Sequence, residues 1–223
     1  MQPWLVDTPL GPCRLTVSAA ADSRAVLLLG HGAGGGIEAF DLVALAQWLP
    51  SRGVTVIRHE QPWRVAGRKT VALPDLVDLG WRPALDAVVT RFAGMPLWVG
   101  GRSAGARGAC RGFDSRQSGV VCLSFPLHPP GRPEVSRIGE LAGVAGPVLV
   151  VQGESDPFGS PQDVRDAAVA AGGAQPLVVS VPGTHSFSRR ADVRDVIVAS
   201  VAAFLGSDRW SRGGDPGVRR DDE

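Results

Sequence analysis

The chain has 223 residues, of which 44% are hydrophobic and 20% are charged. This composition excludes a chain that is disordered throughout, and the length is sufficient to bury a core without disulfides or a structural metal. Lysine and arginine together number 23, and aspartate and glutamate number 22, for a formal net charge of +1. Such a balance lacks the basic field of a dedicated nucleic-acid-binding protein, so we expect no nucleic-acid partner.

The predicted elements follow from short apolar runs that alternate with longer segments of helical period. In chain order the pattern predicts strand 14–18, strand 25–29, helix 39–49, strand 54–58, helix 82–92, strand 97–100, helix 104–113, strand 120–124, strand 148–152, helix 160–171, strand 177–181 and helix 191–205. Such alternation is typical of an α/β fold with a mostly parallel central sheet and helices on both faces. The start of helix 160–171 is the best marked, because Ser160 suits the N-cap, Pro161 the first position and Asp163 the first turn.

The predicted elements form one α/β domain over residues 1–206. The composition then shifts to glycine and charged residues, and we expect residues 207–223 to be a disordered C-terminal tail. Residues 59–79 make an unusually long predicted connection. They form either a lid or pocket wall, or a solvent-facing excursion with a short helix.

Two features of the sequence bear on location. The N-terminus lacks the basic and apolar stretches of a secretory signal, and no apolar run reaches 18 residues, so we expect no membrane association. The three cysteines, Cys13, Cys110 and Cys122, are an odd number without metal-ligand spacing. We interpret them as reduced, buried thiols and expect a cytoplasmic location.

A glycine-rich segment follows the predicted strand 25–29. Gly30, Gly32 and Gly35 match the Gly-x-Gly-x-x-Gly fingerprint of dinucleotide-binding folds, and Arg58 ends the next predicted strand, where a 2′-phosphate would bind. The chain shows no second dinucleotide-binding half, which makes NADP binding the least favoured interpretation. A phosphate-binding P-loop is excluded, because the single lysine of the chain does not follow a glycine.

Residues 101–105 read Gly-Arg-Ser-Ala-Gly and join the predicted strand 97–100 to the predicted helix 104–113. A serine between a strand and a helix in this pattern is typical of a nucleophile elbow. The serine there lies in a strained turn of positive φ, and glycines on either side allow the strand and helix backbones to approach closely. The pattern predicts that Ser103 is a nucleophile.

A serine hydroxyl needs a neighbouring base that is itself oriented by a carboxylate. The predicted strand 148–152 is followed by Asp156, and the predicted strand 177–181 is followed by His185. Because the carboxyl ends of parallel strands meet at one edge of a sheet, we expect these side chains to lie beside Ser103. The order serine, aspartate, histidine along the chain is that of α/β-hydrolases.

With these motifs the sequence resembles an α/β-hydrolase of the small dienelactone-hydrolase-like type. Residues 30–35, 101–105 and 126–131 resemble, more narrowly, the hydrolase-like domain of subunit three of the NSL histone-acetyltransferase complex and its testis-expressed relative. The resemblance covers about residues 10–206. It implies a mostly parallel sheet flanked by helices, with little or no cap domain.

The resemblance also implies roles for two backbone groups and one carboxylate. The N–H of Ala33, which follows His-Gly, and the N–H of Ala104, which follows the nucleophile, would together form an oxyanion hole. The orienting acid would be Asp156, which lies deep in its loop and precedes Pro157 as in the family pattern. Glu154 is the chemically acceptable alternative.

Five further residues are candidates for the wall of a substrate pocket. They are His31, Trp63, Leu127, His128 and Phe158. His31 either touches substrate or, as the favoured alternative, braces the glycine-rich loop through backbone hydrogen bonds. The others either line the pocket or belong to ordinary core and loop packing. None of these residues has metal-ligand spacing, so no metal is predicted.

Basic residues also cluster around the elbow. Arg102, Arg107 and Arg111 are either anion-binding groups or, as is commoner on helices, ion-paired or solvated residues. The remaining histidine, His59, is interpreted as structural.

These residues together predict a serine hydrolase that cleaves a carboxylic ester or thioester of a small to medium acyl group, without a cofactor. Its partner is then a small-molecule substrate, and no oligomeric state follows from the sequence. The alternatives are a non-catalytic, hydrolase-like scaffold that binds proteins and, third, an NADP-binding protein. A reactive serine distinguishes the first interpretation from the other two.

Overall fold

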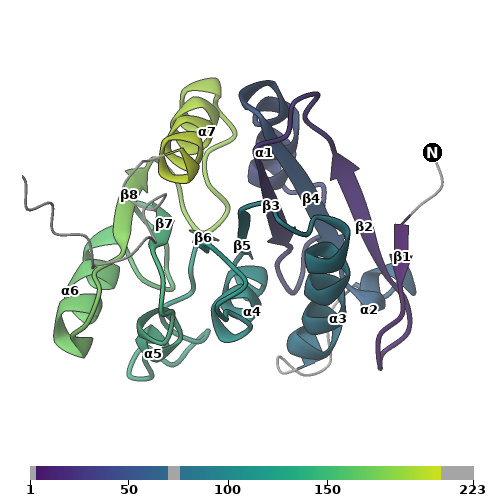
Figure 1. Cartoon of the computed structure of the whole chain (residues 1–223). Helices are drawn as coiled ribbons and strands as arrows, with labels where there is room; N and C mark the ends of the chain where they lie inside the picture. Colours follow the sequence, from purple (N-terminus) through teal and green to yellow (C-terminus); the bar gives the residue numbers. More distant parts are fainter. Residues whose placement is uncertain (1–3, 70–75, 207–223) are drawn as a thin grey trace, which may run out of the picture.

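A computed structural model describes residues 4–69 and 76–206 of the chain (Figure 1). In this part of the chain the strands form one eight-stranded sheet in the order β1-β2-β4-β3-β5-β6-β7-β8. The strands are β1 (Trp4–Val6), β2 (Cys13–Ser18), β3 (Ala25–Gly30), β4 (Val54–Glu60), β5 (Leu97–Arg102), β6 (Gly119–Leu123), β7 (Val148–Gly153) and β8 (Leu177–Val181). The helices are α1 (Phe40–Trp48), the 3₁₀-helix η1 (Pro50–Arg52), α2 (Pro62–Val65), α3 (Leu76–Arg91), α4 (Ala104–Arg111), α5 (Ile138–Ala142), α6 (Pro161–Ala171) and α7 (Ala191–Leu205).

The sheet is mostly parallel. From β4 through β3, β5, β6 and β7 to β8, each strand runs parallel to its neighbour, whereas β2 is antiparallel to β4 and β1 is antiparallel to β2. The predicted fold class is confirmed. Parallel strands place their carboxyl ends at the same edge of the sheet, and this edge carries the residues that the sequence singles out.

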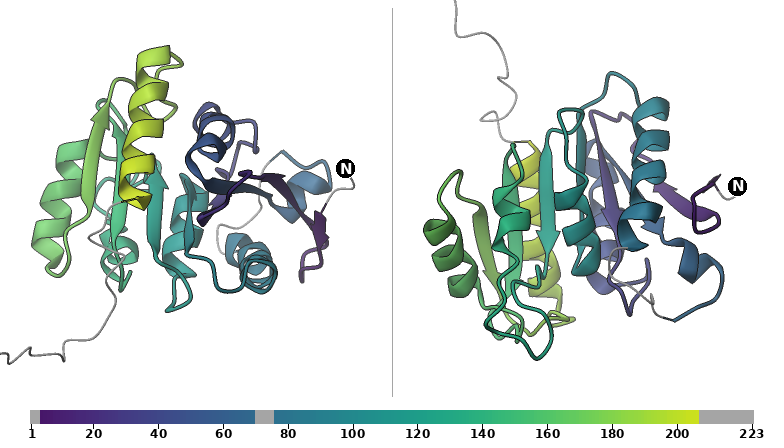
Figure 2. Two further views of the ribbon diagram at one scale, coloured as in Figure 1. Left: turned by 45° about the horizontal axis from the view of Figure 1, so that its top comes forward. Right: turned by 90° about the horizontal axis from the view of Figure 1, so that it is seen from below.

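Helices cover both faces of the sheet (Figures 1 and 2). Helices α3, α4, α5 and α6 pack on one face, and α1 and α7 pack on the other. Successive residues of β3 alternate between the two layers: Val26 and Leu28 belong to the first core cluster, and Leu27 and Leu29 to the second. Because both faces of β3 are covered, the strand is an uninterrupted apolar run rather than an alternating one.

Most predicted elements are confirmed within a few residues. The helix predicted over 191–205 has the bounds Ala191–Leu205, and α6 begins with the predicted cap, since Ser160 and Asp163 exchange hydrogen bonds in a capping box. The structure adds β1, α2 and α5, which have three, four and five residues. Elements this short do not show a periodicity that a sequence pattern can detect.

The predicted start of helix 82–92 is wrong, because α3 begins at Leu76 and contains Pro83. Because proline lacks a backbone N–H, it is tolerated in the first turn of a helix and disfavoured in its interior. A helix predicted from sequence is therefore placed so that it starts near the proline. In the structure, Val77 and Trp81 lie N-terminal to Pro83 and are both buried, and Trp81 belongs to the core cluster on this face of the sheet. This packing holds the first turns of α3 in place.

The predicted long connection 59–79 is largely structured. Its first two residues complete β4, and it contains α2 and the start of α3, while residues 70–75 lie outside the described part of the chain. Trp63 in α2 is 7% exposed. The first part of this span is therefore packed against the domain and is not a solvent-facing excursion.

Little structure intervenes between the sheet edge and solvent. Residues 124–147, between β6 and β7, contain only α5, so no cap domain is inserted there. Among the described helices, none combines the length and hydropathy that a bilayer crossing requires. The predicted tail over residues 207–223 lies outside the described residues.

Leu45→Ala tests the packing of α1. Leu45 is fully buried in the core cluster beneath α1 and α7, so its truncation should lower the free energy of unfolding by about 2–5 kcal/mol. The matched control is Leu79→Ala in α3, where the side chain is 42% exposed and the loss should stay below about 1 kcal/mol. Urea unfolding measures both values, and equal losses would contradict the packing described.

Candidate active site

A sharp turn between β5 and α4 carries Ser103. Ser103 has φ 52° and ψ −112°, outside the usual regions for a residue with a side chain, and its N–H donates to the carbonyl of Leu123 at 3.0 Å. The flanking glycines make the turn possible, because a Cβ on Gly101 or Gly105 would collide with the backbone of Gly30 in β3. The turn therefore raises the serine side chain at the carboxyl edge of the sheet.

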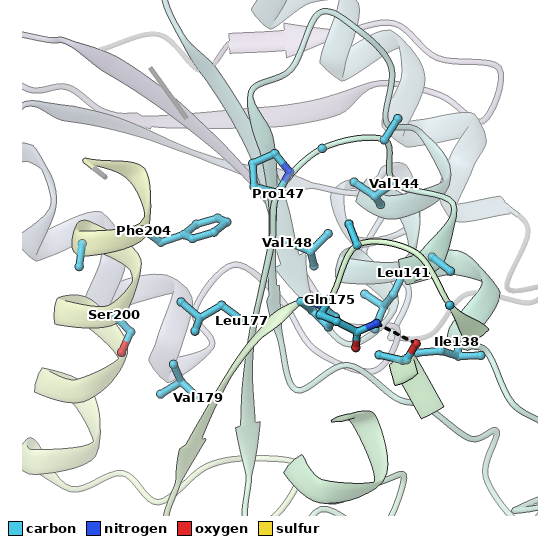
Figure 3. A pocket seen from close by; sticks show the side chains of 18 residues that line it. Ile138, Leu141, Val144, Pro147, Val148, Gln175, Leu177, Val179, Ser200 and Phe204 are labelled. Atoms are coloured by element: carbon cyan, nitrogen blue, oxygen red, sulfur yellow. Dashed lines mark hydrogen bonds between the residues drawn. The ribbon is translucent and has the colours of Figure 1, made fainter. Parts of the chain in front are cut away.

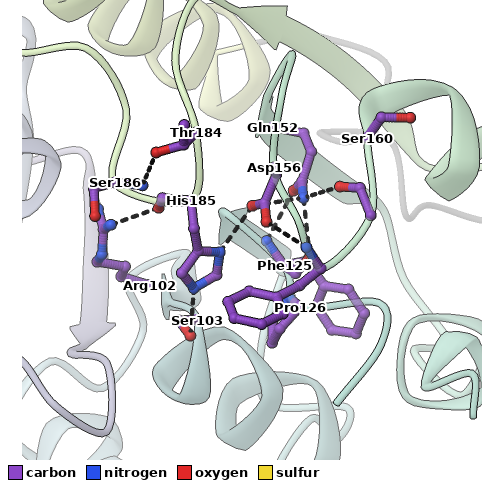
Figure 4. Close-up of polar contacts among 12 residues, drawn as sticks. Arg102, Ser103, Phe125, Pro126, Gln152, Asp156, Ser160, Thr184, His185 and Ser186 are labelled. Carbon is purple, nitrogen blue, oxygen red and sulfur yellow. Dashed lines mark hydrogen bonds and ion pairs between the residues drawn. The ribbon is translucent and has the colours of Figure 1, made fainter. Parts of the chain in front are cut away.

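Three side chains at this edge form a hydrogen-bonded chain (Figure 4). Nε2 of His185 lies 2.9 Å from Oγ of Ser103, and Nδ1 of His185 lies 2.8 Å from Oδ2 of Asp156. Asp156 is fully buried at its side chain and accepts a second bond from the N–H of Phe158 at 2.9 Å. A carboxylate only accepts, so Nδ1 of His185 carries the hydrogen, and Nε2 is left to accept from the serine hydroxyl.

The structure thus brings together Ser103, Asp156 and His185, which follow β5, β7 and β8. Glu154, the alternative acid, is exposed and makes no bond to His185 within the described residues. The carboxylate that faces the histidine is that of Asp156.

Gln152 is a site residue that the sequence reasoning missed. It lies in β7, is fully buried, and its Nε2 donates to Oδ2 of Asp156 at 3.1 Å and to the carbonyl of Gly159 at 2.7 Å. Its amide also exchanges two hydrogen bonds with the backbone of Phe125, at 2.9 and 3.1 Å. The signal in the sequence is a single polar residue in an otherwise apolar strand, which a buried strand tolerates only when the polar group is satisfied.

The glycine-rich loop lies directly against the serine. A Cβ on Gly32 would lie 3.6 Å from Cβ of Ser103, and Ala33 is the next residue of the loop. The N–H of Ala104 is the first of α4 and has no partner within the helix. Helix α1 begins only at Phe40, whereas in a dinucleotide fingerprint the helix opens within the motif.

A family model described as an alpha/beta hydrolase domain matches residues 23–197. The chain belongs to the α/β-hydrolase family. The family match and the eight-stranded, mostly parallel sheet both indicate the α/β-hydrolase fold. The predicted resemblance to α/β-hydrolases is therefore confirmed at the level of family and fold.

Solved structures of similar fold come from several organisms. An α/β serine hydrolase homologue from Coxiella burnetii has 19% identity and a TM-score of 0.73, with coverage of 90% of this chain and 97% of that one. An α/β serine hydrolase without lid from Xanthomonas campestris has 24% identity and a TM-score of 0.71, with coverage of 92% and 95%. An esterase from Pyrococcus furiosus has 15% identity and a TM-score of 0.74, with coverage of 94% and 91%. At these identities the likeness shows the fold.

His31 makes hydrogen bonds to the backbone that brace the glycine-rich loop. Its Nε2 accepts from the N–H of Gln61 at 3.1 Å, so Nδ1 carries the hydrogen and donates to the carbonyl of Gly32 at 2.7 Å. Burial lowers the pKa of His31, which favours this neutral ring. Trp63 packs edge-on against His31, with ring centroids 5.6 Å apart.

The other predicted pocket residues, Leu127, His128 and Phe158, differ in their surroundings. The ring of Phe158 stands edge-on to His185, with centroids 4.7 Å apart. Leu127 is 1% exposed and belongs to the core. His128 donates its backbone N–H to Phe158 at 2.9 Å, and its Nδ1 lies 2.9 Å from the carbonyl of Val135. Phe158 is thus the pocket candidate in direct contact with the hydrogen-bonded chain.

An apolar cavity of about 1160 Å³ lies elsewhere (Figure 3). Residues from α5, α6 and α7 and from the amino-terminal ends of β7 and β8 line it, among them Leu141, Val148 and Leu177. The predicted site residues follow the carboxyl ends of the strands, and none of them lines this cavity. The cavity therefore lies at the opposite edge of the sheet from Ser103.

Arginines near the elbow are ion-paired. Arg107 pairs with Glu140 at 2.6 Å, and Arg111 pairs with Asp78 at 2.7 Å, which ties α4 to α5 and α3. Arg102 pairs with the buried Asp41 at 3.0 Å. The interpretation of these arginines as ion-paired is confirmed.

The three thiols of the chain are all buried. Cys13, Cys110 and Cys122 are free and buried, as predicted. Burial raises the pKa of Cys13 to about 11, and the neighbouring thiol of Cys110 together with burial raises the pKa of Cys122. Over residues 4–69 and 76–206, no group of three or more His, Cys, Asp or Glu side chains is placed to hold a metal ion.

His59 lies in β4, beneath the site. It is fully buried and packs edge-on against Trp81, with ring centroids 5.7 Å apart. Neither ring nitrogen has a hydrogen-bond partner in the described part of the chain. Burial lowers the pKa of His59 to about 3, with a smaller contribution from His31 nearby, so the ring is neutral in the folded protein.

His59→Leu should change how stability depends on pH. The unfolded chain protonates a histidine below about pH 6.5, whereas the native protein keeps His59 neutral down to about pH 3. Because the unfolded state binds the extra proton, stability falls as pH decreases through this window, by about 1.4 kcal/mol per unit. Between pH 7 and pH 5 the free energy of unfolding, measured in guanidinium, should fall by about 2 kcal/mol less in the variant than in the wild type. Equal falls in the two proteins would contradict a buried, neutral His59.

Gly105→Ala tests the close approach at the elbow. The new Cβ would collide with the backbone of Gly30, so α4 must shift and stability should fall by about 1–3 kcal/mol. Gly139→Ala in α5 is the matched control, because a Cβ there meets nothing within 4 Å in the described structure. That change should be neutral or stabilise by up to about 1 kcal/mol. Thermal unfolding of both variants distinguishes the two positions.

Proposed function

We propose that this α/β-hydrolase is a serine hydrolase that cleaves a carboxylic ester or thioester of a small to medium acyl group. The observation that carries the proposal is the hydrogen-bonded chain from Ser103 through His185 to the buried Asp156, at 2.9 and 2.8 Å. A serine with a base on one side and an oriented carboxylate behind that base is the arrangement that acyl transfer requires.

In the proposed reaction Oγ of Ser103 attacks the substrate carbonyl while Nε2 of His185 takes the hydroxyl proton. Asp156 holds the imidazole in the required tautomer and stabilises the imidazolium that forms. His185 then returns the proton to the departing alkoxide or thiolate. A water molecule attacks the acyl-serine by the same route, which releases the carboxylic acid and regenerates Ser103.

The negative charge that develops on the carbonyl oxygen needs hydrogen-bond donors beside the serine. The N–H groups of Ala33 and Ala104 are proposed for this role, since Gly32 approaches Ser103 closely and Ala104 opens α4. The positive end of the α4 dipole adds to the same stabilisation. Small residues in the loop allow this approach.

The proposed substrate class is inferred from the fold and from the solved structures of similar fold. Residues 124–147 insert no cap domain over the site, and the solved neighbours include proteins described as a serine hydrolase without lid and an esterase. Phe158, edge-on to His185, is proposed as a wall of the acyl pocket. A small-molecule ester or thioester is the substrate that fits an uncapped site of this kind.

The narrower likeness to the NSL subunit and its testis-expressed relative rests on the residues around Leu127 and His128. It favours a second candidate, a hydrolase-like scaffold that binds proteins without catalysis. A scaffold has no need of a hydrogen-bonded serine, histidine and aspartate, so the reactivity of the serine separates the two candidates.

Labelling with a fluorophosphonate, followed by intact-mass measurement, tests the proposal. Wild type should gain one adduct, and Ser103→Ala should gain none and should lose ester turnover by roughly 10³- to 10⁶-fold. Ser124→Ala is the matched control, since Ser124 also has positive φ (49°) at the end of a neighbouring strand but has no partner for its hydroxyl among the described residues. It should label like wild type. A folded wild type that stays unlabelled would exclude the catalytic proposal and favour the scaffold.

A further inference from the structure

We propose that Arg102 is a positioning residue that holds the loop of His185 in register with Ser103. The inference rests on the proposed function and goes beyond it, because the Arg102 side chain donates to Asp41 and to the backbone of His185 and is given no step in the proposed reaction. Its role is to fix where the base stands.

The guanidinium of Arg102 makes two bonds in different directions. Nη2 donates to the backbone carbonyl of His185 at 2.6 Å, and Nη1 donates to Oδ2 of Asp41 at 3.0 Å (Figure 4 shows the first bond). The Arg102 side chain is 13% exposed and that of Asp41 is fully buried. Both bonds are charge-assisted and shielded from water, which makes them stronger and more rigid than surface contacts.

These bonds join three segments that the sequence separates widely. Arg102 ends β5 and immediately precedes Ser103, Asp41 lies in the first turn of α1 after the glycine-rich loop, and His185 lies beyond β8. The side chain of Arg102 therefore links the strand that leads to Ser103, helix α1 and the loop that carries His185. Asp41 in turn accepts the N–H of Leu42 at 3.0 Å, so its carboxylate is itself held.

The loop of His185 needs such an anchor. Phe187, two residues further on, has φ 50°, an uncommon conformation for a residue with a side chain, and the guanidinium of Arg102 stands 5.6 Å from its ring centre. On its imidazole side His185 is held by Asp156. The bond from Arg102 holds the backbone of the same residue, so side chain and backbone are fixed independently.

Arginine suits this position because its planar fork carries several donors in fixed directions. A lysine at 102 has the charge to pair with Asp41 but only a single nitrogen, which cannot reach the Asp41 carboxylate and the His185 carbonyl in the same geometry. Methionine keeps the length and loses both bonds. Comparison of the two variants therefore separates the effect of the positive charge at position 102 from the effect of the two directed hydrogen bonds.

The test compares Arg102→Lys and Arg102→Met with wild type for ester turnover and for the rate of fluorophosphonate labelling. Displacing the base by a fraction of an ångström should lower kcat and the labelling rate by about 10- to 100-fold in Arg102→Met, with KM nearly unchanged, and by less in Arg102→Lys. Arg111→Met is the matched control, since it removes another partly buried, ion-paired arginine that does not contact the loop. The folded Arg111→Met protein should have the kcat and the labelling rate of the wild type. Wild-type rates in Arg102→Met would overturn the proposal.

A double variant guards against a general loss of folding. Arg102→Met leaves the carboxylate of Asp41 buried without its arginine partner, which lowers the stability of the folded protein. Adding Asp41→Asn removes that buried charge. The double variant should regain thermal stability while its kcat stays low. Recovery of kcat with stability would overturn the proposal, because it would trace the defect to the buried charge and not to the lost bond to His185.

Hydrogen exchange keeps the two proposals distinguishable. If wild type is folded but gains no fluorophosphonate adduct, the catalytic proposal fails, and the exchange of the backbone amides in residues 183–188 still reports on the anchor. Exchange there should be faster in Arg102→Met than in wild type and Arg111→Met. Equal exchange in all three proteins would overturn the positioning role.

Discussion

The carboxyl ends of β3, β5, β7 and β8 lie at one edge of the sheet because the four strands run parallel. The candidate site depends on this constraint. Each strand delivers one segment to the edge: the glycine-rich loop, the elbow with Ser103, the loop with Asp156 and the loop with His185. The sheet brings together residues more than 80 positions apart, and hydrogen bonds of 2.8 and 2.9 Å complete the arrangement.

A second constraint is the contact between β3 and the elbow. Gly30 pairs with Gly101 across the sheet, and the backbone of Gly30 also meets Gly105 at the start of α4. Side chains at these positions would push α4 away from the sheet, and Ser103 would move with it. The strained turn at Ser103 is held by this packing, and the same packing fixes the start of α4, where Ala104 follows Ser103.

Buried polar groups behind the site supply its rigidity. Gln152 ties Asp156 to the backbones of Phe125 and Gly159, and Arg102 ties His185 to Asp41. Each of these groups is costly to bury alone and stabilising once its partners are in place. His185 is thus held from both sides, through its ring by Asp156 and through its backbone by Arg102.

The sequence by itself determined the local features. Uninterrupted apolar runs predicted the buried parallel strands, Ser160 and Asp163 predicted the capping box that α6 has, and the pattern around Ser103 predicted a turn between strand and helix. These features depend on neighbours along the chain, and a linear pattern contains that information. The catalytic roles of Ser103, Asp156 and His185 and the oxyanion role of Ala33 and Ala104 stay predictions that the geometry supports.

The sequence predicted that Ser103, Asp156 and His185 lie close together, and only the tertiary structure decided between alternatives and showed the further contacts among distant groups. Asp156 and not Glu154 faces His185, Gln152 reaches Asp156, and Arg102 spans Asp41 and the carbonyl of His185. The start of α3 before Pro83 was decided in the same way, by the burial of Trp81 against the sheet. In each of these cases the favourable energy comes from a contact across the fold that no motif, periodicity or spacing in the sequence marks.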